Sequence, residues 1–309
     1  MIESPLRFLY DVQASAIRCV AIFGKDIKAE RTKSVGKVID TLRSLGVEIY
    51  VESTFAQLLE QQAGSAVCAQ LQRFDTCPSC VEMAISMGGD GTFLSTAAKL
   101  GLHQVPILGV NTGRLGFLAD VTPDRIETAL QQIVKGHYNI SSRTLISVEV
   151  VGGRIDTYPF ALNEVAVLKH DNSSLIEVET HVDGQLLTNY LADGLIVSTP
   201  TGSTGYALSV GGPVLAPESP TFCVAPVAPH SLTMRPVILS DEGVMSLRVK
   251  SRTGHFLLAI DGRSKSLAEG CVITLRKASY KVMVVKTEGN DFFNTLRNKM
   301  MWGVDQRNG

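Results

Sequence analysis

The spacing of apolar residues divides this chain of 309 residues into two parts. In the first part, short apolar runs alternate with segments in which apolar residues recur at helical spacing. The strand-like runs cover 19–24, 47–52, 81–87 and 105–111, and the helical segments cover 34–46, 93–101 and 122–134. Because strands that pair in parallel need a long crossover connection, this alternation indicates a parallel sheet covered by helices. We therefore predict a Rossmann-like α/β domain over residues 1–140.

Beyond a polar connection at 135–143, the pattern changes to many short strands. Two-residue hairpin turns favour glycine and aspartate because they require unusual backbone conformations. Three dipeptides of this kind lie in the second part: Gly152-Gly153, Asp183-Gly184 and Asp261-Gly262. We predict a β-rich domain over 141–285. The remaining residues, 286–309, contain a helical pattern, and we expect this C-terminal helix to pack back on the first domain.

Composition excludes several broad classes of protein. Hydrophobic residues make up 45% of the chain and charged residues 19%, which is typical of a globular protein. The formal net charge is −1, so we expect no nucleic-acid partner bound by bulk electrostatics. No apolar run approaches the roughly 18 residues that span a bilayer, and the start of the chain has no signal-peptide core. We expect a cytoplasmic protein with no membrane partner.

The chain has six cysteines, of which Cys77 and Cys80 have CxxC spacing. This spacing fits a redox pair or half of a zinc site. A zinc site needs a second pair of ligands, and the sequence contains no other CxxC and no HxxxH. We therefore expect a reduced pair on a surface loop and no metal held by protein ligands alone.

A glycine cluster, Gly88-Gly89-Asp90-Gly91-Thr92, follows a strand-like run and precedes a helical segment. At this place in an open α/β sheet, ligands bind beyond the ends of the strands, and a helix N-terminus favours phosphate. The cluster is neither a Walker A loop, because no Lys-Ser/Thr pair follows, nor a strict G-x-G-x-x-G fingerprint. Two interpretations stay open: a phosphate-binding turn, or a tight turn in which Asp90 caps the helix.

Two segments of the second part carry polar residues suited to a ligand. Residues 199–214 combine many hydroxyl side chains with glycines, and Asp193 precedes them. Asn163-Glu164 interrupts an apolar strand. Because unpartnered polar groups are costly to bury, this pair indicates either a ligand contact or a buried polar network.

Other polar positions are weaker candidates. The glycine-rich segment 109–118 contains Arg114, which could meet an anion. His230 and Arg235 lie in one short polar segment, where a histidine is more often structural than functional. The sequence contains no G-x-S-x-G elbow and no convincing Ser-His-Asp order.

Taken together, these segments resemble the NAD kinase family, whose members phosphorylate the 2′-hydroxyl of the adenosine ribose of NAD. The matching residues occur in family order and cover nearly the whole chain from about Cys19. They are GGDGT at 88–92, NTGRLGFL at 111–118, NEV at 163–165, DGLIVSTPTGSTGYALSVGGP at 193–213, PHSLTMRP at 229–236, IDG at 260–262 and LRNKMMWG at 296–303. The resemblance implies an α/β domain followed by a β-rich domain, with the site in the cleft between them.

The resemblance also implies a role for individual residues. Asp90 matches the proposed general base for the ribose hydroxyl, with Gly91 beside it in the NAD site. Gly88, Gly89 and Thr92 belong to the loop that would hold the phosphate donor. The other implied NAD contacts are Asn163, Glu164, Asp193, Thr204, Gly205, Tyr206, Ala207, Leu208, Ser209 and Ala228.

The family further implies partners and cofactors. We expect NAD as acceptor, ATP or polyphosphate as donor, and a homodimer or homotetramer. A divalent ion, Mg²⁺ by preference, suits a chain with no dedicated metal cage, because Mg²⁺ commonly keeps waters and substrate oxygens as ligands. An aspartate is a weak base for an alcohol, so orientation of the hydroxyl should matter more than its early deprotonation.

This chain departs from the usual family pattern at three positions. Leu191 and Ser95 stand where many members have arginine, and Gly205 stands where alanine is usual. One cationic contact is therefore missing or supplied from elsewhere. Two alternatives stay open: another GGDGT phosphotransferase such as a lipid kinase, and a non-catalytic dinucleotide sensor that kept the fold.

Overall fold

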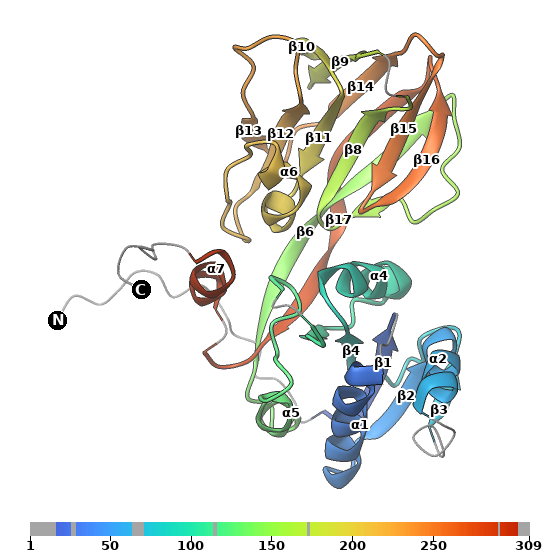
Figure 1. Ribbon diagram of the computed structural model, residues 1–309, viewed down its shortest axis with the longest axis vertical. Helices are drawn as coiled ribbons and strands as arrows, with labels where there is room; N and C mark the ends of the chain where they lie inside the picture. Colours follow the sequence, from blue (N-terminus) through green and yellow to red (C-terminus); the bar gives the residue numbers. More distant parts are fainter. Residues whose placement is uncertain are drawn as a thin grey trace, which may run out of the picture. The chain divides into compact units, whose positions relative to one another are not determined.

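The computed structural model describes residues 17–25, 29–63, 71–113, 116–171, 174–289 and 291–301 (Figure 1). Internal contacts divide the chain into two compact units. The first unit extends to Ser142 and takes in the chain again from Val282, and the second unit is Arg143–Lys281. The domain boundaries that we predicted from the sequence, at residues 140 and 285, remain predictions.

The first unit contains a parallel sheet. Its strands are β1 (Cys19–Gly24), β2 (Glu48–Glu52), β3 (Gln72–Phe74), β4 (Met83–Met87) and β5 (Ile107–Val110), in the spatial order β3-β2-β1-β4-β5. Every neighbouring pair is parallel. The strands β1, β4 and β5 are buried almost throughout, as expected of a sheet covered on both faces. The predicted α/β class is confirmed for this unit.

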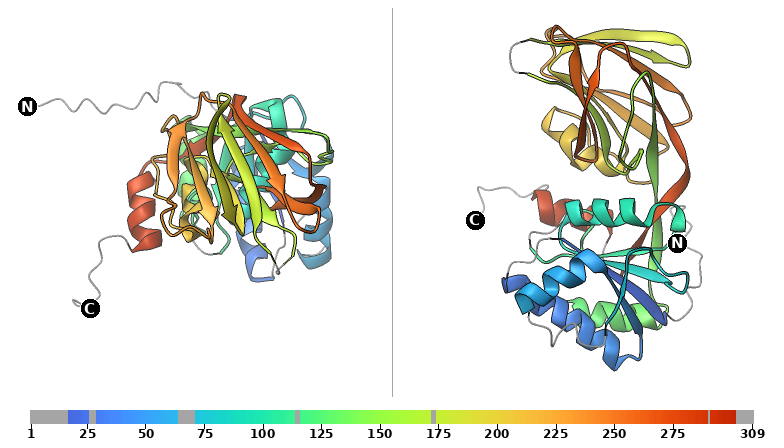
Figure 2. Two further views of the ribbon diagram at one scale, coloured as in Figure 1. Left: turned by 90° about the horizontal axis from the view of Figure 1, so that it is seen from above. Right: turned by 90° about the vertical axis from the view of Figure 1, so that its right-hand side faces the viewer.

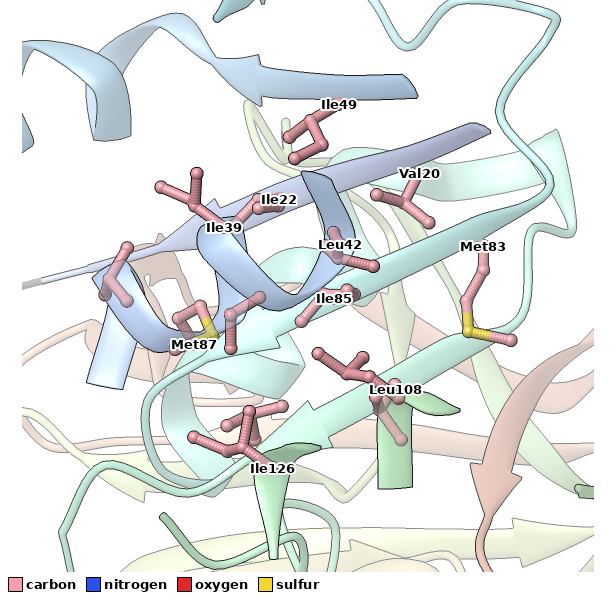
Figure 3. Close-up of a cluster of buried hydrophobic side chains, with 14 of the residues drawn as sticks. Val20, Ile22, Ile39, Leu42, Ile49, Met83, Ile85, Met87, Leu108 and Ile126 are labelled. Atoms are coloured by element: carbon pink, nitrogen blue, oxygen red, sulfur yellow. The ribbon is translucent and has the colours of Figure 1, made fainter. Parts of the chain in front are cut away.

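Helices cover both faces of this sheet (Figure 2). The helices of this unit are α1 (Ala29–Ser44), α2 (Ser53–Ala63), α4 (Asp90–Leu100), η1 (Gly101–His103), α5 (Ile126–Val134) and α7 (Phe292–Met300). Ile39 and Leu42 of α1 and Ile126 of α5 meet one face of the sheet, where Ile22 and Ile85 point toward them (Figure 3). Thr96 of α4 donates to Ser86, whose side chain points to the other face of β4, so α4 covers that face.

The second unit contains strands of two sheets. In one, β10 (Gln185–Ala192), β9 (Ile176–Val182), β14 (Met245–Lys250) and β17 (Val272–Lys286) lie in that order, and β6 (Asn139–Val151) pairs with β17 and with β7 (Phe160–Ala161). In the other, the order is β13 (Val237–Ser240), β12 (Thr221–Val227), β11 (Gly194–Ser198), β8 (Glu164–Lys169), β15 (His255–Ile260) and β16 (Arg263–Ala268). Val178, Phe222 and Phe256 belong to one buried cluster drawn from both sheets. The predicted β-rich unit is confirmed.

The short helices η2 (Thr201–Thr204) and α6 (Tyr206–Ser209) follow β11 in the second unit. The strand β17 runs on into the first unit, where Val284 pairs in parallel with Ile107. No helix of the described residues is long and apolar enough to cross a membrane.

Several sequence-based boundaries were wrong. The helix expected from Thr122 begins at Ile126, and Thr122 instead starts a turn in which its carbonyl accepts from the N–H of Arg125. The polar segment predicted as a connection already enters strand β6 at Asn139. Residues 272–286 lie mostly in the part expected to hold many short strands, but they form one long strand, β17. The short edge strands β3 and β13 were missed, because a few residues at a sheet edge carry little alternation.

The predicted hairpin turns had mixed outcomes. Asp183 and Gly184 both have positive φ, 49° and 78°, between paired strands β9 and β10. Asp261 and Gly262 do the same, at 47° and 78°, between β15 and β16. Gly152-Gly153 does not join two strands directly, since residues 152–159 separate β6 from β7.

We predict that Phe55→Ala lowers the free energy of unfolding by about 3–5 kcal/mol, because it empties a fully buried ring site. The Phe55 ring packs directly against Gly24. An ideal Cβ on Gly24 would lie only 2.0 Å from the ring, so Phe55 fills the space that a side chain at position 24 would need. Urea unfolding measures the loss. Phe293→Ala is the matched control, because that ring is 62% exposed and its removal should change stability by less than about 1 kcal/mol.

Candidate functional site

Asp90 is the first residue of α4, and its carboxylate does not cap that helix. The N-cap is Gly89, whose carbonyl accepts from Thr92 and Phe93 at 3.0 and 3.1 Å. Gly88 approaches Thr92 so closely that a Cβ would stand 2.2 Å from Thr92 Oγ1. The tight turn expected from the glycines is present, but the alternative in which Asp90 caps the helix is wrong.

The Asp90 carboxylate instead binds the segment after β5. Oδ2 accepts from the N–H of Phe117 at 2.9 Å, and Oδ1 accepts from Leu118 and Ala119 at 3.0 Å each. Three consecutive backbone donors thus converge on one side chain. Gly116 makes this approach possible, because a Cβ at that position would lie 2.0 Å from Asp90 Oδ1.

Lys299 of α7 completes the surroundings of Asp90. Its Nζ lies 3.4 Å from Asp90 Oδ2 and 4.4 Å from the centroid of the Phe117 ring. Phe117 also contacts Phe292, the first residue of α7, with ring centroids 6.5 Å apart. The predicted packing of the C-terminal helix on the first unit is confirmed by these contacts. Arg114, the anion-binding candidate, lies outside the described residues.

Asn111 shapes the same segment from its start. Its side chain donates to the carbonyl of Ala119 at 3.3 Å and accepts from the N–H of Gly113 at 2.6 Å. Its own N–H donates to Val121 at 2.8 Å. The segment after β5 is therefore closed on itself by Asn111 and fixed to α4 by Asp90.

Asp261 organises a second polar cluster, in the second unit. Its carboxylate accepts from Leu162 N–H at 2.8 Å, from Asn163 N–H at 2.8 Å and from Glu164 N–H at 3.1 Å. Asp261 sits in the turn between β15 and β16, and its own N–H donates to the carbonyl of Glu164 at 3.0 Å. The turn that the sequence predicted as a hairpin therefore also holds the Asn163-Glu164 pair in place.

Asn163 and Glu164 keep unused acceptors. Among the described residues, Asn163 Oδ1 and Glu164 Oε2 are buried without a hydrogen-bond partner. Burial and, to a smaller extent, the charge of Asp261 raise the pKa of Glu164 to about 7, although a hydrogen bond from the N–H of Tyr206 acts to lower it. Burial raises the pKa of Asp261 as well. Two neighbouring hydrogen-bond acceptors without partners suit a ligand that has hydrogen-bond donors.

The hydroxyl-rich segment folds against this pair. Thr199 Oγ1 donates to the carbonyl of Leu162 at 2.6 Å and accepts from the N–H of Gly202 at 3.1 Å. A Cβ on Gly202 would lie 2.1 Å from the carbonyl oxygen of Asn163, and one on Gly205 would lie 3.0 Å from Glu164 Oε2. Several hydroxyls therefore serve the local backbone rather than a ligand.

The remaining candidates of the second unit lie on either side of this segment. Tyr206, the first residue of α6, is 38% exposed. Asp193 pairs with Lys169 at 2.6 Å. Ala228 has a φ of +43°, which is unusual for a residue other than glycine. Of the other predicted NAD contacts, Ala207 is buried, Ser209 is exposed, and Thr204 and Leu208 are half-buried.

The weaker candidates show ordinary structural roles. Arg235 donates to the carbonyls of Leu232 and Met234 at 2.7 and 2.8 Å. The N–H of His230 donates to the carbonyl of Leu191, and both side chains are exposed. Leu191, which stands where many family members have arginine, is 45% exposed.

The cysteine pair is joined by a third cysteine that spacing did not reveal. Cys19 Sγ lies 3.4 Å from Cys80 Sγ, and Cys77 is half-buried beside them. Burial, the hydrogen bond to Cys80 and neighbouring acidic groups raise the pKa of Cys19 to about 12, which disfavours a thiolate ligand. Among the described residues, no group of three or more His, Cys, Asp or Glu side chains could hold a metal ion.

Comparison with known proteins decides the family. Residues 20–138 match the ATP-NAD kinase N-terminal domain, and residues 162–287 match the ATP-NAD kinase C-terminal domain. The chain is 44% identical to the NAD kinase of Bacteroides fragilis over 287 residues, which cover 93% of this chain and 99% of that one. The chain belongs to the NAD kinase family.

Other relatives and solved structures agree. The NAD kinase of Porphyromonas gingivalis is 40% identical over 290 residues, covering 93% of this chain and 99% of that one. An NAD kinase from Archaeoglobus fulgidus, solved in complex with ATP, superposes with a TM-score of 0.72 at 28% identity, covering 92% and 98% of the two chains. A yeast NADH kinase complexed with NADH shares the fold, with a TM-score of 0.81 at 23% identity and 94% and 89% coverage.

These matches confirm the family and fold class predicted from the sequence, and they do not favour a lipid kinase or a non-catalytic sensor. Sequence reasoning missed Gly116, Asp261 and Lys299 as parts of the two clusters. Asp261 was noted as a hairpin residue and within the IDG family match, but not as a partner of Asn163 and Glu164. Lys299 lies 209 positions from Asp90, so no local spacing could connect them.

We call Asp90, the residues 116–119 that surround its carboxylate, and Lys299 the Asp90 cluster. We predict that Gly116→Ala disrupts this cluster, because the added methyl group has no room beside Asp90 Oδ1. The free energy of unfolding should fall by about 1–3 kcal/mol, and any activity that depends on Asp90 should fall with it. Chemical unfolding and turnover measure the two effects. Gly36→Ala in α1 is the matched control, because nothing lies within 4 Å of the place that its new methyl group would take. Equal stability of the two variants would contradict the tight fit at Gly116.

We predict that Glu164 makes stability depend on pH. Its pKa of about 7 in the folded protein exceeds that of the unfolded chain, so the folded protein binds the proton more tightly. The stabilisation is present below pH 4.5 and is lost as pH rises toward about 7. Glu164→Gln should remove a difference on the order of 2 kcal/mol between pH 5 and pH 8. Urea unfolding of both proteins at both pH values measures it, and identical pH slopes would contradict the assignment.

Proposed function

We propose that this family member transfers the γ-phosphoryl group of ATP to the 2′-hydroxyl of the adenosine ribose of NAD, giving NADP. The observation that carries the proposal is the Asp90 carboxylate, fixed by three backbone N–H groups at the N-terminus of α4. A carboxylate held so firmly is suited to orient a hydroxyl group. The family match supplies the acceptor and the donor.

Asp90 acts in this proposal by alignment and late proton transfer. Phosphoryl transfer commonly passes through a loose transition state, in which the attacking oxygen needs to be in line more than it needs to be deprotonated early. The hydroxyl donates to Asp90 while its oxygen approaches the γ-phosphorus. The proton passes to Asp90 as the new bond forms, so the low basicity of an aspartate is sufficient.

The NAD contacts are assigned to the residues that match the family pattern. The buried, unpaired Asn163 Oδ1 and Glu164 Oε2 would accept from hydroxyl or amino groups of the ligand. Tyr206, with its exposed ring, would stack on a base or touch its edge. The full set of proposed contacts is Asp90, Gly91, Asn163, Glu164, Asp193, Thr204, Gly205, Tyr206, Ala207, Leu208, Ser209 and Ala228.

The phosphate donor is assigned to the turn before α4. Gly88, Gly89 and Thr92 form this turn, and Gly91 leaves open space where a side chain would stand. The described residues contain no metal-binding cluster, which fits an Mg²⁺ ion carried by the donor's phosphates and waters. Such an ion would neutralise phosphate charge. Polyphosphate as a second donor, a homodimer or homotetramer, and a cytoplasmic location stay predictions.

We predict that Asp90→Asn lowers kcat by at least about 100-fold, because the amide cannot take the hydroxyl proton, while NAD binding falls little. The purified protein is incubated with NAD, ATP and Mg²⁺, and NADP is measured with an NADP-specific dehydrogenase. Calorimetry measures NAD binding separately. Asp75→Asn is the matched control, since Asp75 is exposed in the same unit.

Two results would contradict this proposal. Comparable kcat in Asp90→Asn and wild type would remove Asp90 from the chemistry. Binding of NAD by the wild-type protein without NADP formation from ATP or polyphosphate would restore the sensor alternative.

A further inference from the structure

Lys299, near the end of α7, places its ammonium group against the carboxylate of Asp90. Nζ lies 3.4 Å from Oδ2 and 4.4 Å from the centroid of the Phe117 ring. The side chain of Lys299 is still 32% exposed, and that of Asp90 is 28% exposed. The ammonium group therefore lies between a carboxylate and an aromatic ring, where solvent and a ligand can still reach it.

The Asp90 carboxylate has no acceptor position left in this arrangement. An ionised carboxylate offers about four lone-pair sites. Oδ1 accepts from two backbone N–H groups, and Oδ2 accepts from one backbone N–H group and from Lys299. A substrate hydroxyl that donates to Asp90 must therefore displace one of these four donors.

Lys299 is the donor that can leave. The three backbone donors lie at 2.9–3.0 Å and are fixed by the fold around Gly116. The Lys299 contact, at 3.4 Å, is longer than the roughly 2.7–2.9 Å usual for a charged N–H to a carboxylate. Lysine also carries its charge on a flexible stem. A hydroxyl that donates to Oδ2 would therefore take the place of Lys299.

An ammonium group displaced from Oδ2 would remain beside the hydroxyl that replaces it. Building on the proposed function, we propose that Lys299 is a further catalytic residue: it holds Asp90 in the free enzyme, yields Oδ2 to the 2′-hydroxyl and binds the transferred phosphoryl group. A bond forms from the 2′-oxygen to the γ-phosphorus, and the bond to the bridging oxygen breaks. ADP leaves with that electron pair, and the hydroxyl proton passes to Asp90. Lys299 donates to the phosphoryl oxygens throughout.

A purely structural role for Lys299 would be to hold α7 in place. The helix has other attachments that serve this purpose. Asp291 caps it by accepting from the N–H of Asn294 at 2.7 Å, and Phe292 contacts Phe117. Truncation of Lys299 should therefore leave α7 folded, so the two roles can be separated by experiment.

The test compares Lys299→Met with Arg297→Met, which removes the same charge from an exposed position on the same helix. We expect Lys299→Met to lower kcat about 10- to 100-fold, the effect of one charged hydrogen bond, with KM for NAD changed less than about twofold. NADP carries the transferred phosphate, so calorimetry should show NADP affinity falling by a similar factor while NAD affinity holds. Lys299→Arg should recover part of both losses, and Arg297→Met should match wild type.

Several results would overturn the proposal. It fails if Lys299→Met matches Arg297→Met in kcat and NADP affinity, or if NAD and NADP affinity fall together. Should Lys299→Met not fold, by its melting temperature, Lys299→Gln is read by the same criteria. A wild-type protein that forms no NADP overturns the proposed function and this inference with it, whereas an active wild type with an unaffected Lys299→Met overturns this inference alone.

Discussion

Asp90 accepts hydrogen bonds from three consecutive backbone N–H groups, and the arrangement of the residues around it depends on these bonds. Asp90 fixes residues 117–119 to the start of α4, which covers one face of the parallel sheet. Two glycine positions permit it, since Gly88 and Gly116 leave no room for side chains. The same carboxylate is the group assigned to the acceptor hydroxyl. Its position is set before any ligand binds, which is what preorganised catalysis requires.

The second unit uses the same device for a different purpose. Asp261 accepts hydrogen bonds from the three consecutive N–H groups of residues 162–164. It thereby holds Asn163 and Glu164 in a position where each side chain keeps a buried oxygen without a hydrogen-bond donor. The cost of that arrangement appears in the raised pKa of Glu164, because a buried carboxylate beside another acid resists ionisation. A ligand that donates hydrogen bonds would remove this cost. Unsatisfied acceptors in an otherwise bonded cluster are therefore better explained by binding than by stability.

The sequence predicted what depends on local periodicity and turn chemistry. Buried strands such as β1 and β4 alternate with helices clearly enough to define the sheet, and Asp183-Gly184 marked a hairpin correctly. Strand β3 was missed because three edge residues carry almost no pattern. The partners of Asp90 could not be predicted, for another reason. Phe117 and Lys299 lie far from Asp90 in the sequence and contact it only in the folded protein, so no local sequence pattern indicates these contacts.

The central claim is that the Asp90 cluster directs a phosphoryl group to one sugar hydroxyl of NAD. Phosphorus NMR of the wild-type protein with NAD, ATP and Mg²⁺ tests it directly. The account predicts one new phosphomonoester signal, coupled to the 2′ proton of the adenosine ribose, that grows as ADP appears in equal amount. Inorganic phosphate as the only product of ATP consumption, or a phosphomonoester on another hydroxyl, would contradict it.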